Sequence, residues 1–362
     1  MQLIDWRVAT ATATRLVPPG PRLPLAEAVA TVEDLRRRAA EADGHVRRYT
    51  GLDVPADPSA VAVVDRPEWI RSNVEGFRTL VDPMLESLSS SRSLSFGPVA
   101  ATVGPKATGA EVGALLAYLA TRVLGQFELL GPPPGEGGAA GRLTLVAPNV
   151  VATERAMGVH PGDFRLWVCL HEVTHRTQFA AAPWLHDHVR SLLRDYLTAA
   201  DLDPAALLGR LRSAAGSLGA VVRGGSELSL LELVQTPEQR AVLDRVTGLM
   251  SLLEGHADVV MDGVGPDVVP SVEQIRSRFE GRRRSGNPVE RMLRRLFGIE
   301  MKMKQYAEGA AFVRAVVDRV GMAGLNRVWA SPDLLPDAAE IRAPQRWLTR
   351  VAEPPALPAV ND

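Results

Sequence analysis

The chain has 362 residues, of which 46% are hydrophobic and 23% charged, and its formal net charge is −1 at pH 7. This composition is ordinary for a globular protein, and the near-neutral charge gives no overall signal for binding to nucleic acid or to a membrane surface. The single cysteine, Cys169, excludes an intramolecular disulfide and suits a reducing compartment, so we expect a cytoplasmic protein.

We expect neither a signal peptide nor a membrane-spanning helix. Residues 1–6 do not combine a basic segment with an apolar core. Elsewhere no uninterrupted apolar run reaches about 18 residues. The most apolar helical segment, residues 110–130, contains Glu111, Arg122 and Glu128, so we expect it to lie in the core.

The remaining pattern predicts many helices and few strands. Apolar residues at helical spacing predict helices over 5–50, with a break at Pro18–Pro21, and over 66–88. Segments rich in Ser, Gly and Pro predict loops over 87–109 and 131–138. Residues 142–151 form the best strand candidate, and Pro148 predicts that this strand ends there or lies at an edge.

The sequence His171-Glu172-Val173-Thr174-His175 has the pattern H-E-x-x-H, inside an apolar segment that we expect to be helical. Residues four apart on a helix differ by about 40° around the axis, so His171 and His175 can direct nitrogens to one metal ion. Glu172 leaves the helix at another angle and could reach a water on that ion. The pattern therefore predicts a zinc site with Glu172 as general base. The alternative is a helix with two surface histidines and a chance glutamate.

A third ligand is expected from the segment Leu253-Glu254-Gly255-His256-Ala257-Asp258. Glu254 and Asp258 are four apart on an expected helix over 237–262, so they share a face. One carboxylate can bind the metal while the other accepts a hydrogen bond from a ligand histidine. His256 is a rival ligand or a donor to the oxyanion, but residues two apart point in different directions, so His256 and Glu254 cannot easily bind one ion.

Two later segments raise further possibilities. Residues 276–295 hold eight arginines, yet no aromatic platform interleaves them, so we expect a solvated surface and no nucleic-acid partner.

Residues 299–320 are expected to be helical and carry Tyr306. A zinc peptidase needs a donor for the oxyanion, and Tyr306 is a candidate. A packed tyrosine with a satisfied hydroxyl is an equal alternative.

H-E-x-x-H followed by a helical E-x-x-x-D resembles the gluzincin branch of the zincin metallopeptidases. This resemblance implies that His171, His175 and Glu254 bind zinc, that Glu172 is the base, and that Asp258 supports the first histidine. The spacer of 79 positions from His175 to Glu254 is much longer than in well-studied members.

A closer resemblance rests on Trp167–His175, Leu253–Asp258 and Lys304–Gly309. These stretches are similar to an uncharacterised, largely actinobacterial zincin-like family, whose members are labelled presumed hydrolases or proteins associated with deazaflavin-coenzyme biosynthesis. The second label reflects genome context and implies no chemistry. In zincins an edge strand precedes the H-E-x-x-H helix and pairs with extended substrate, a role that residues 142–151 would fill; an ordinary strand is equally compatible.

We therefore expect a predominantly helical α+β fold, zincin-like, with a small sheet next to the H-E-x-x-H helix. Residues 1–130 would form a helical N-terminal region and residues 131–362 the metal-site region, in one compact unit. The expected function is zinc-dependent hydrolysis of an amide or peptide bond in a peptide or small amide substrate. The alternatives are a catalytically silent zincin-fold scaffold and a non-peptidase zinc hydrolase acting on a small molecule. The oligomeric state is not readable from the sequence.

Overall fold

The computed structural model describes residues 4–54, 61–91, 98–128, 141–199, 236–284 and 299–352. The chain divides into two compact units, Met1–Pro183 with Val260–Glu280, and Trp184–Val259 with Gly281–Asp362. The division expected at residue 130, within one compact unit, stays a prediction. In the described ranges, no helix has the length and apolar character needed to cross a bilayer.

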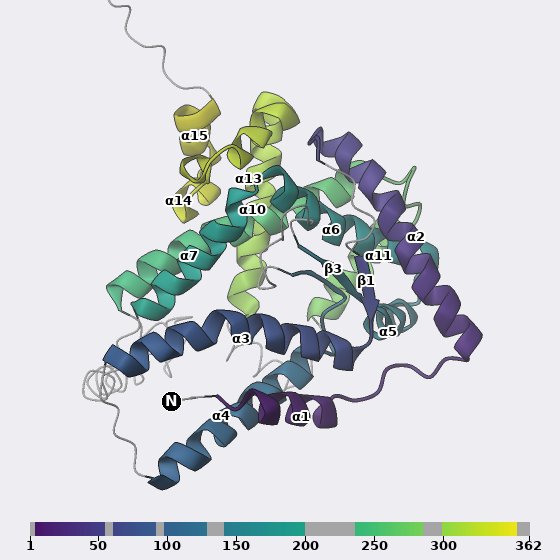
Figure 1. Cartoon of the computed structure of the whole chain (residues 1–362). Helices are drawn as coiled ribbons and strands as arrows, with labels where there is room; N and C mark the ends of the chain where they lie inside the picture. The colour runs from purple at the N-terminus through teal and green to yellow at the C-terminus, as the bar shows by residue number, and fades with distance from the viewer. Residues whose placement is uncertain are drawn as a thin grey trace, which may run out of the picture. The chain divides into compact units, whose positions relative to one another are not determined.

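The first unit combines long helices with a small sheet (Figure 1). Its described elements, in chain order, are α1 (Trp6–Leu16), α2 (Leu25–Thr50), β1 (Val61–Val64), α3 (Arg66–Ser91), α4 (Pro98–Leu119), β2 (Gly125–Phe127), β3 (Leu143–Val146), α5 (Ala147–Met157), α6 (Pro161–Ala181) and α11 (Val272–Arg284). The last residues of α10 (Pro237–Val264) also belong to this unit. The predicted mostly helical α+β architecture is confirmed.

The sheet has the strand order β1-β3-β2, with β1 parallel and β2 antiparallel to β3. The strand predicted over 142–151 is present only over Leu143–Val146, so it ends before Pro148, which was one of the two expected outcomes. It lies in the centre of the sheet, so the other expected outcome, an edge strand, does not hold. The physical reason is that Pro148 occupies the first turn of α5, a position where a missing N–H costs nothing. Within the described residues, the edge next to α6 is β2.

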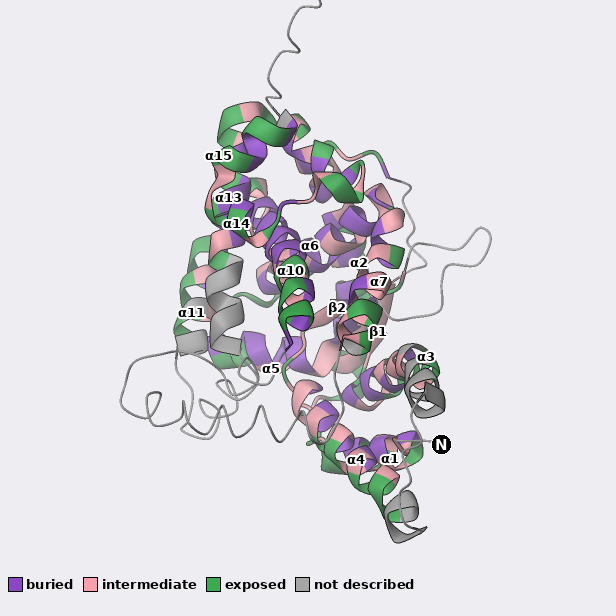
Figure 2. Cartoon of the chain, turned by 90° about the vertical axis from the view of Figure 1, so that its left-hand side faces the viewer, coloured by how far each residue is buried: buried purple, intermediate pink, exposed green. Residues whose placement is uncertain are grey.

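The two faces of the sheet pack against different helices because side chains alternate along each strand. Leu143 and Leu145 belong to a buried cluster with residues of α2 and α6. Val146 joins a second cluster built by α1, α3 and α4. Figure 2 shows the buried residues of these elements in purple. The sheet is therefore covered on both sides, and α6 packs directly on one face.

The helix predictions for the first unit are largely confirmed, with two corrections. Residues 87–109 were expected to be a loop, but α3 continues to Ser91 and α4 begins at Pro98. Pro105 lies inside α4, so the proline content of this segment misled the prediction. The helix expected over 110–130 ends at Leu119 and is followed by β2. The loop expected over 131–138 lies outside the described residues.

The second unit contains α7 (Trp184–Thr198), most of α10, α13 (Ile299–Leu325) and short C-terminal elements. These are η2 (Asn326–Trp329), η3 (Pro332–Leu334), α14 (Ala338–Arg342), α15 (Pro344–Trp347) and η4 (Leu348–Ala352). The predicted helices over 237–262 and 299–320 are confirmed by α10 and α13.

Two glycines bring the backbones of α10 and α13 together. A Cβ at Gly255 would lie 2.2 Å from the carbonyl carbon of Gly309, and a Cβ at Gly309 would lie 1.9 Å from the carbonyl oxygen of Ser251. Only glycine is compatible with such a close crossing. The motif residues around Gly255 and those around Gly309 are thus held next to each other within this unit.

Candidate metal centre

The two histidines of the H-E-x-x-H motif converge on one side of α6. Nε2 of His171 and Nε2 of His175 are 3.2 Å apart, and the two rings are nearly perpendicular, at 87°. The spacing of one helical turn, predicted from the sequence, is therefore present with both Nε2 atoms directed at the same point.

This arrangement fits a tetrahedral zinc ion. Two nitrogens at about 2.0–2.1 Å from zinc, separated by a tetrahedral angle, are about 3.3 Å apart. The observed Nε2–Nε2 separation of 3.2 Å is close to this value. The donor chemistry also fits, because neutral imidazole is a preferred ligand of zinc.

Each imidazole uses its other nitrogen for a contact that orients the ring. Nδ1 of His175 is 2.9 Å from Oε1 of Gln178, which is fully buried. Since an amide oxygen only accepts, this contact requires a proton on Nδ1 and leaves the lone pair on Nε2. Nδ1 of His171 is 3.2 Å from the thioether sulfur of Met261 at the end of α10. Both rings are thus held in an orientation suited to metal binding.

Glu172 is buried, with 7% of its surface exposed, and lies against the edge strand β2. A Cβ at Gly125 would be 2.5 Å from Cγ and 2.7 Å from Oε1 of Glu172, so the backbone of β2 passes directly beside the carboxylate. Seven residues later on the same face of α6, Phe179 stacks on Phe127 with ring centroids 5.0 Å apart. The edge strand and the glutamate are therefore neighbours within the first unit.

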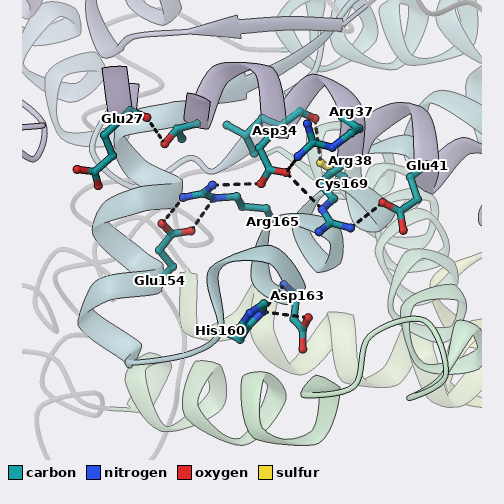
Figure 3. Close-up of polar contacts among 12 residues, drawn as sticks. Glu27, Asp34, Arg37, Arg38, Glu41, Glu154, His160, Asp163, Arg165 and Cys169 are labelled. Carbon is teal, nitrogen blue, oxygen red and sulfur yellow. Dashed lines mark hydrogen bonds and ion pairs between the residues drawn. The ribbon is translucent and has the colours of Figure 1, made fainter. Parts of the chain in front are cut away.

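Ion pairs fasten α6 to its neighbours before the motif. The guanidinium of Arg165 binds both carboxylate oxygens of Glu154 on α5, at 2.7 and 3.0 Å, and Asp34 of α2 at 3.1 Å (Figure 3). Burial lowers the pKa of Arg165, but hydrogen bonds and charge from Glu154 and Asp34 outweigh it and raise this pKa. Just after the motif, Arg176 pairs with Asp43 of α2. The motif lies between these two anchors.

Cys169 is buried two residues before His171, on the side of α6 that contacts α2. Its thiol points at the carbonyl oxygen of Leu35 across 3.8 Å. Burial raises the pKa of this thiol, and the negative charges of Glu172 and Asp34 raise it further. The side chain is therefore a neutral, inert packing element.

The predicted site residues of the segment 253–258 lie on α10. Glu254, Asp258 and Met261 occupy positions i, i+4 and i+7 of this helix and so share one face. His256 is fully buried on another face, with its ring 5.5 Å from that of Trp329. The role of each of these residues toward a metal stays a prediction.

Tyr306 lies on α13, three residues before Gly309. Its backbone is therefore one helical turn from the close crossing of α10 and α13 described above. Its side chain lies outside the described set, so its role as oxyanion donor stays a prediction.

Sequence reasoning missed three residues around the histidine pair. The contact of Gln178 with His175 could have been predicted, because Gln178 lies three residues after His175 on the same face of an expected helix. Gly125 and Met261 were not, because their contacts with the motif span 47 and 90 positions in the sequence. Only the folded chain brings them together with α6.

A mostly helical α+β unit with a small sheet, and an H-E-x-x-H helix packed on that sheet, defines the zincin class of metallopeptidases. The whole chain supports this assignment, because the family model of zincin-like metallopeptidases matches residues 4–348. The chain belongs to this zincin-like metallopeptidase family.

One solved structure is also similar over nearly the whole chain. It is the crystal structure of a presumed hydrolase with a novel fold from Chloroflexus aurantiacus, which shares 33% sequence identity and a TM-score of 0.68. The match covers 96% of this chain and 98% of that one. Among proteins with curated functions, none matches. The comparisons therefore support a hydrolase at the level of the family.

Proposed function

We propose that the protein is a zinc-dependent metallohydrolase of the peptidase type. The observation that carries this proposal is the pair of Nε2 atoms of His171 and His175, 3.2 Å apart, next to the buried Glu172. A purely structural zinc site has no use for an acidic residue beside the ligands, whereas a hydrolase needs a general base there.

We propose Glu254 as the third protein ligand. Glu254 shares a face of α10 with Met261, and Met261 contacts His171. His256, the rival, emerges from a different face and packs on Trp329. The described residues also include one set of three potential metal ligands, namely His171, His175 and Glu254. We propose that Asp258, four residues after Glu254, supports His171 by accepting a hydrogen bond from its Nδ1 in place of the sulfur of Met261, which is a weak acceptor.

Zinc, when bound, would act as a Lewis acid and lower the pKa of a water to about 7. The chain's own residues would handle the protons. Glu172 would accept one from the attacking water and deliver it to the leaving nitrogen of an amide. Tyr306 and His256 are our candidates for donating a hydrogen bond to the developing oxyanion.

The preferred substrate class is an extended peptide or a small amide. The support is β2, an edge strand within the described sheet whose Gly125 borders Glu172. An extended peptide that adds to this strand by main-chain hydrogen bonds would run close to the proposed base. The role that the sequence suggested for residues 142–151 therefore passes to β2.

We further infer that the protein works in the cytoplasm and without nucleic acid or membrane. A buried, neutral Cys169 suits a reducing compartment. In the arginine-rich segment, Arg276 pairs with Asp262 and Arg278 donates to backbone carbonyls, so these two side chains already have partners within the first unit.

The test compares zinc-loaded wild type with Glu172→Gln on a peptide library. The account expects cleavage by the wild type and a loss of at least about 100-fold in Glu172→Gln, the usual contribution of a general base. Zinc content should be unchanged because Glu172 is not a ligand. Glu128→Gln, on the opposite face of the sheet, serves as the control and should keep full activity. Cleavage by Glu172→Gln at the wild-type rate would overturn the catalytic role, and a wild type without any cleavage would favour the scaffold alternative.

A further inference from the structure

A groove lined by residues of α1 and α3 lies in the part of the first unit that the metal centre does not use. Figures 1 and 2 show where these two helices lie in the chain. It is a shallow groove, largely open to solvent, with a volume of about 880 Å³. Four arginines line it, Arg7 and Arg15 from α1 and Arg71 and Arg78 from α3.

The arginines are arranged in two groups. Nε1 of Trp6 donates to Asp82 at 2.8 Å, so the start of α1 lies beside the later part of α3 and the two helices run antiparallel. Arg7 and Arg78 therefore lie toward one end of the groove, and Arg15 and Arg71 toward the other. Arg7 and Arg15 are eight positions apart on α1, so their backbone positions are about 12 Å apart along the helix axis.

The four arginines differ in whether a carboxylate of the described residues offsets their charge. Among the lining residues, the only carboxylate in the described set is Glu75. Arg71 pairs with Glu68 and Arg78 approaches Asp82 at 3.6 Å, so carboxylates beside the groove offset the charge of these two arginines. Within the described ranges, Arg7 and Arg15 have no carboxylate within 4.0 Å. The groove therefore has an excess of cationic hydrogen-bond donors.

Between its two ends, the floor of the groove is largely apolar. The buried side chains of Trp6 and Val74 contribute to it, together with Ala11 of α1. The hydroxyl of Thr10 is occupied by the carbonyl oxygen of Trp6. A ligand with an apolar middle would thus cover apolar surface, while its ends could meet guanidinium groups, which bind carboxylates and phosphates in a bidentate manner.

We propose that this groove is a binding site for an elongated organic dianion, with two carboxylate or phosphate groups about 10–12 Å apart and an apolar middle. The site is separate from the metal centre and does not depend on zinc. It would hold an acidic effector, or an acidic part of a ligand, by its two ends.

The experiment is calorimetric titration of the full chain with 1,10-decanedioate, whose carboxylates span the groove when extended. Malonate serves as a short dianion and decanoate as a monoanion of equal length. The proposal expects saturable one-site binding of decanedioate, at least about tenfold tighter than of either control, because only decanedioate reaches both ends. Equal affinity for all three anions would overturn it.

Two double variants locate the binding. Arg7→Gln with Arg15→Gln on α1, and Arg71→Gln with Arg78→Gln on α3, should each weaken decanedioate binding at least about tenfold. Glutamine keeps helix propensity, so the fold is preserved, and circular dichroism checks this. Arg48→Gln on α2, at an exposed position, is the control and should bind like wild type. Binding unaffected by the double variants, or equally weakened by Arg48→Gln, would overturn the proposal. Tight binding of an acidic helical peptide without binding of decanedioate would likewise overturn it, in favour of a protein-docking surface.

Discussion

Gly125 of β2 leaves room for the carboxylate of Glu172, since a Cβ at Gly125 would lie 2.5 Å from Cγ and 2.6 Å from Cδ of that side chain. Contacts below 3.0 Å force something to move. Because Glu172 extends from a helix fastened on both sides of the motif, its side chain would move before the backbone of α6 does.

Gly125→Ala should therefore displace Glu172 and leave the two histidines in place. We expect hydrolysis to fall at least about tenfold, part of the contribution of a general base, with zinc content unchanged. The free energy of unfolding should fall by about 1–3 kcal/mol, as for other overpacked sites. Gln126→Ala, on the opposite face of β2, is the control. Wild-type activity in Gly125→Ala would contradict the proposed placement of the base.

Gln178 should support zinc binding without contacting the metal. Its side-chain oxygen is 2.9 Å from Nδ1 of His175, and loss of such a partner usually weakens metal affinity by 10–100-fold. Gln178→Leu keeps the volume and removes the acceptor, so zinc affinity measured with a competing chelator should fall in this range. Gln178→Glu restores an acceptor and should recover most of the affinity. Equal affinity in all three proteins would exclude a role for Gln178 in orienting the ring.

Arg165 should contribute strongly to stability because it is a largely buried partner of two carboxylates, with 14% of its side chain exposed. Arg165→Met leaves Glu154 buried, with 4% of its side chain exposed, and without its guanidinium partner. We expect a loss of about 3–5 kcal/mol in the free energy of unfolding, measured by urea denaturation. Arg37→Met provides the contrast, since Arg37 pairs with the same Asp34 but is 67% exposed, and its loss should be small. Similar losses in both variants would contradict this assignment.

The fold and the site were predictable to different degrees, for physical reasons. Helical periodicity and the spacing of His171 and His175 are local, so the sequence alone predicts the histidine pair and most helices. Pro148 predicted the end of the strand as one of two outcomes, but its place in the first turn of α5 and the central position of the strand were not predictable, because they depend on packing. The nearness of Gly125 to Glu172 is set by the antiparallel pairing of β2 with β3, which no local pattern predicts.

Cys169 should make the stability depend on pH under alkaline conditions. Its pKa is raised in the folded chain, mainly by burial. Above the ordinary thiol pKa of about 8.5, the unfolded chain releases a proton that the folded chain retains. The free energy of unfolding should then fall by up to about 1.4 kcal/mol per pH unit. Cys169→Ala should lack this contribution. Urea denaturation at pH 8 and pH 10 measures the difference between the two slopes, and identical slopes would contradict the burial of a neutral thiol.

The central claim is that two histidines of α6 and one carboxylate of α10 hold a single zinc ion, and metal analysis of the purified protein tests it most directly. The account predicts about one zinc per chain in the wild type, and loss of that zinc in His171→Ala and in Glu254→Ala, because removal of one of three protein ligands leaves a weak site. Asp258→Asn should retain zinc with reduced affinity. Full zinc content in Glu254→Ala would contradict the ligand assignment and direct attention to His256, and wild-type protein that takes up no zinc would contradict the claim as a whole.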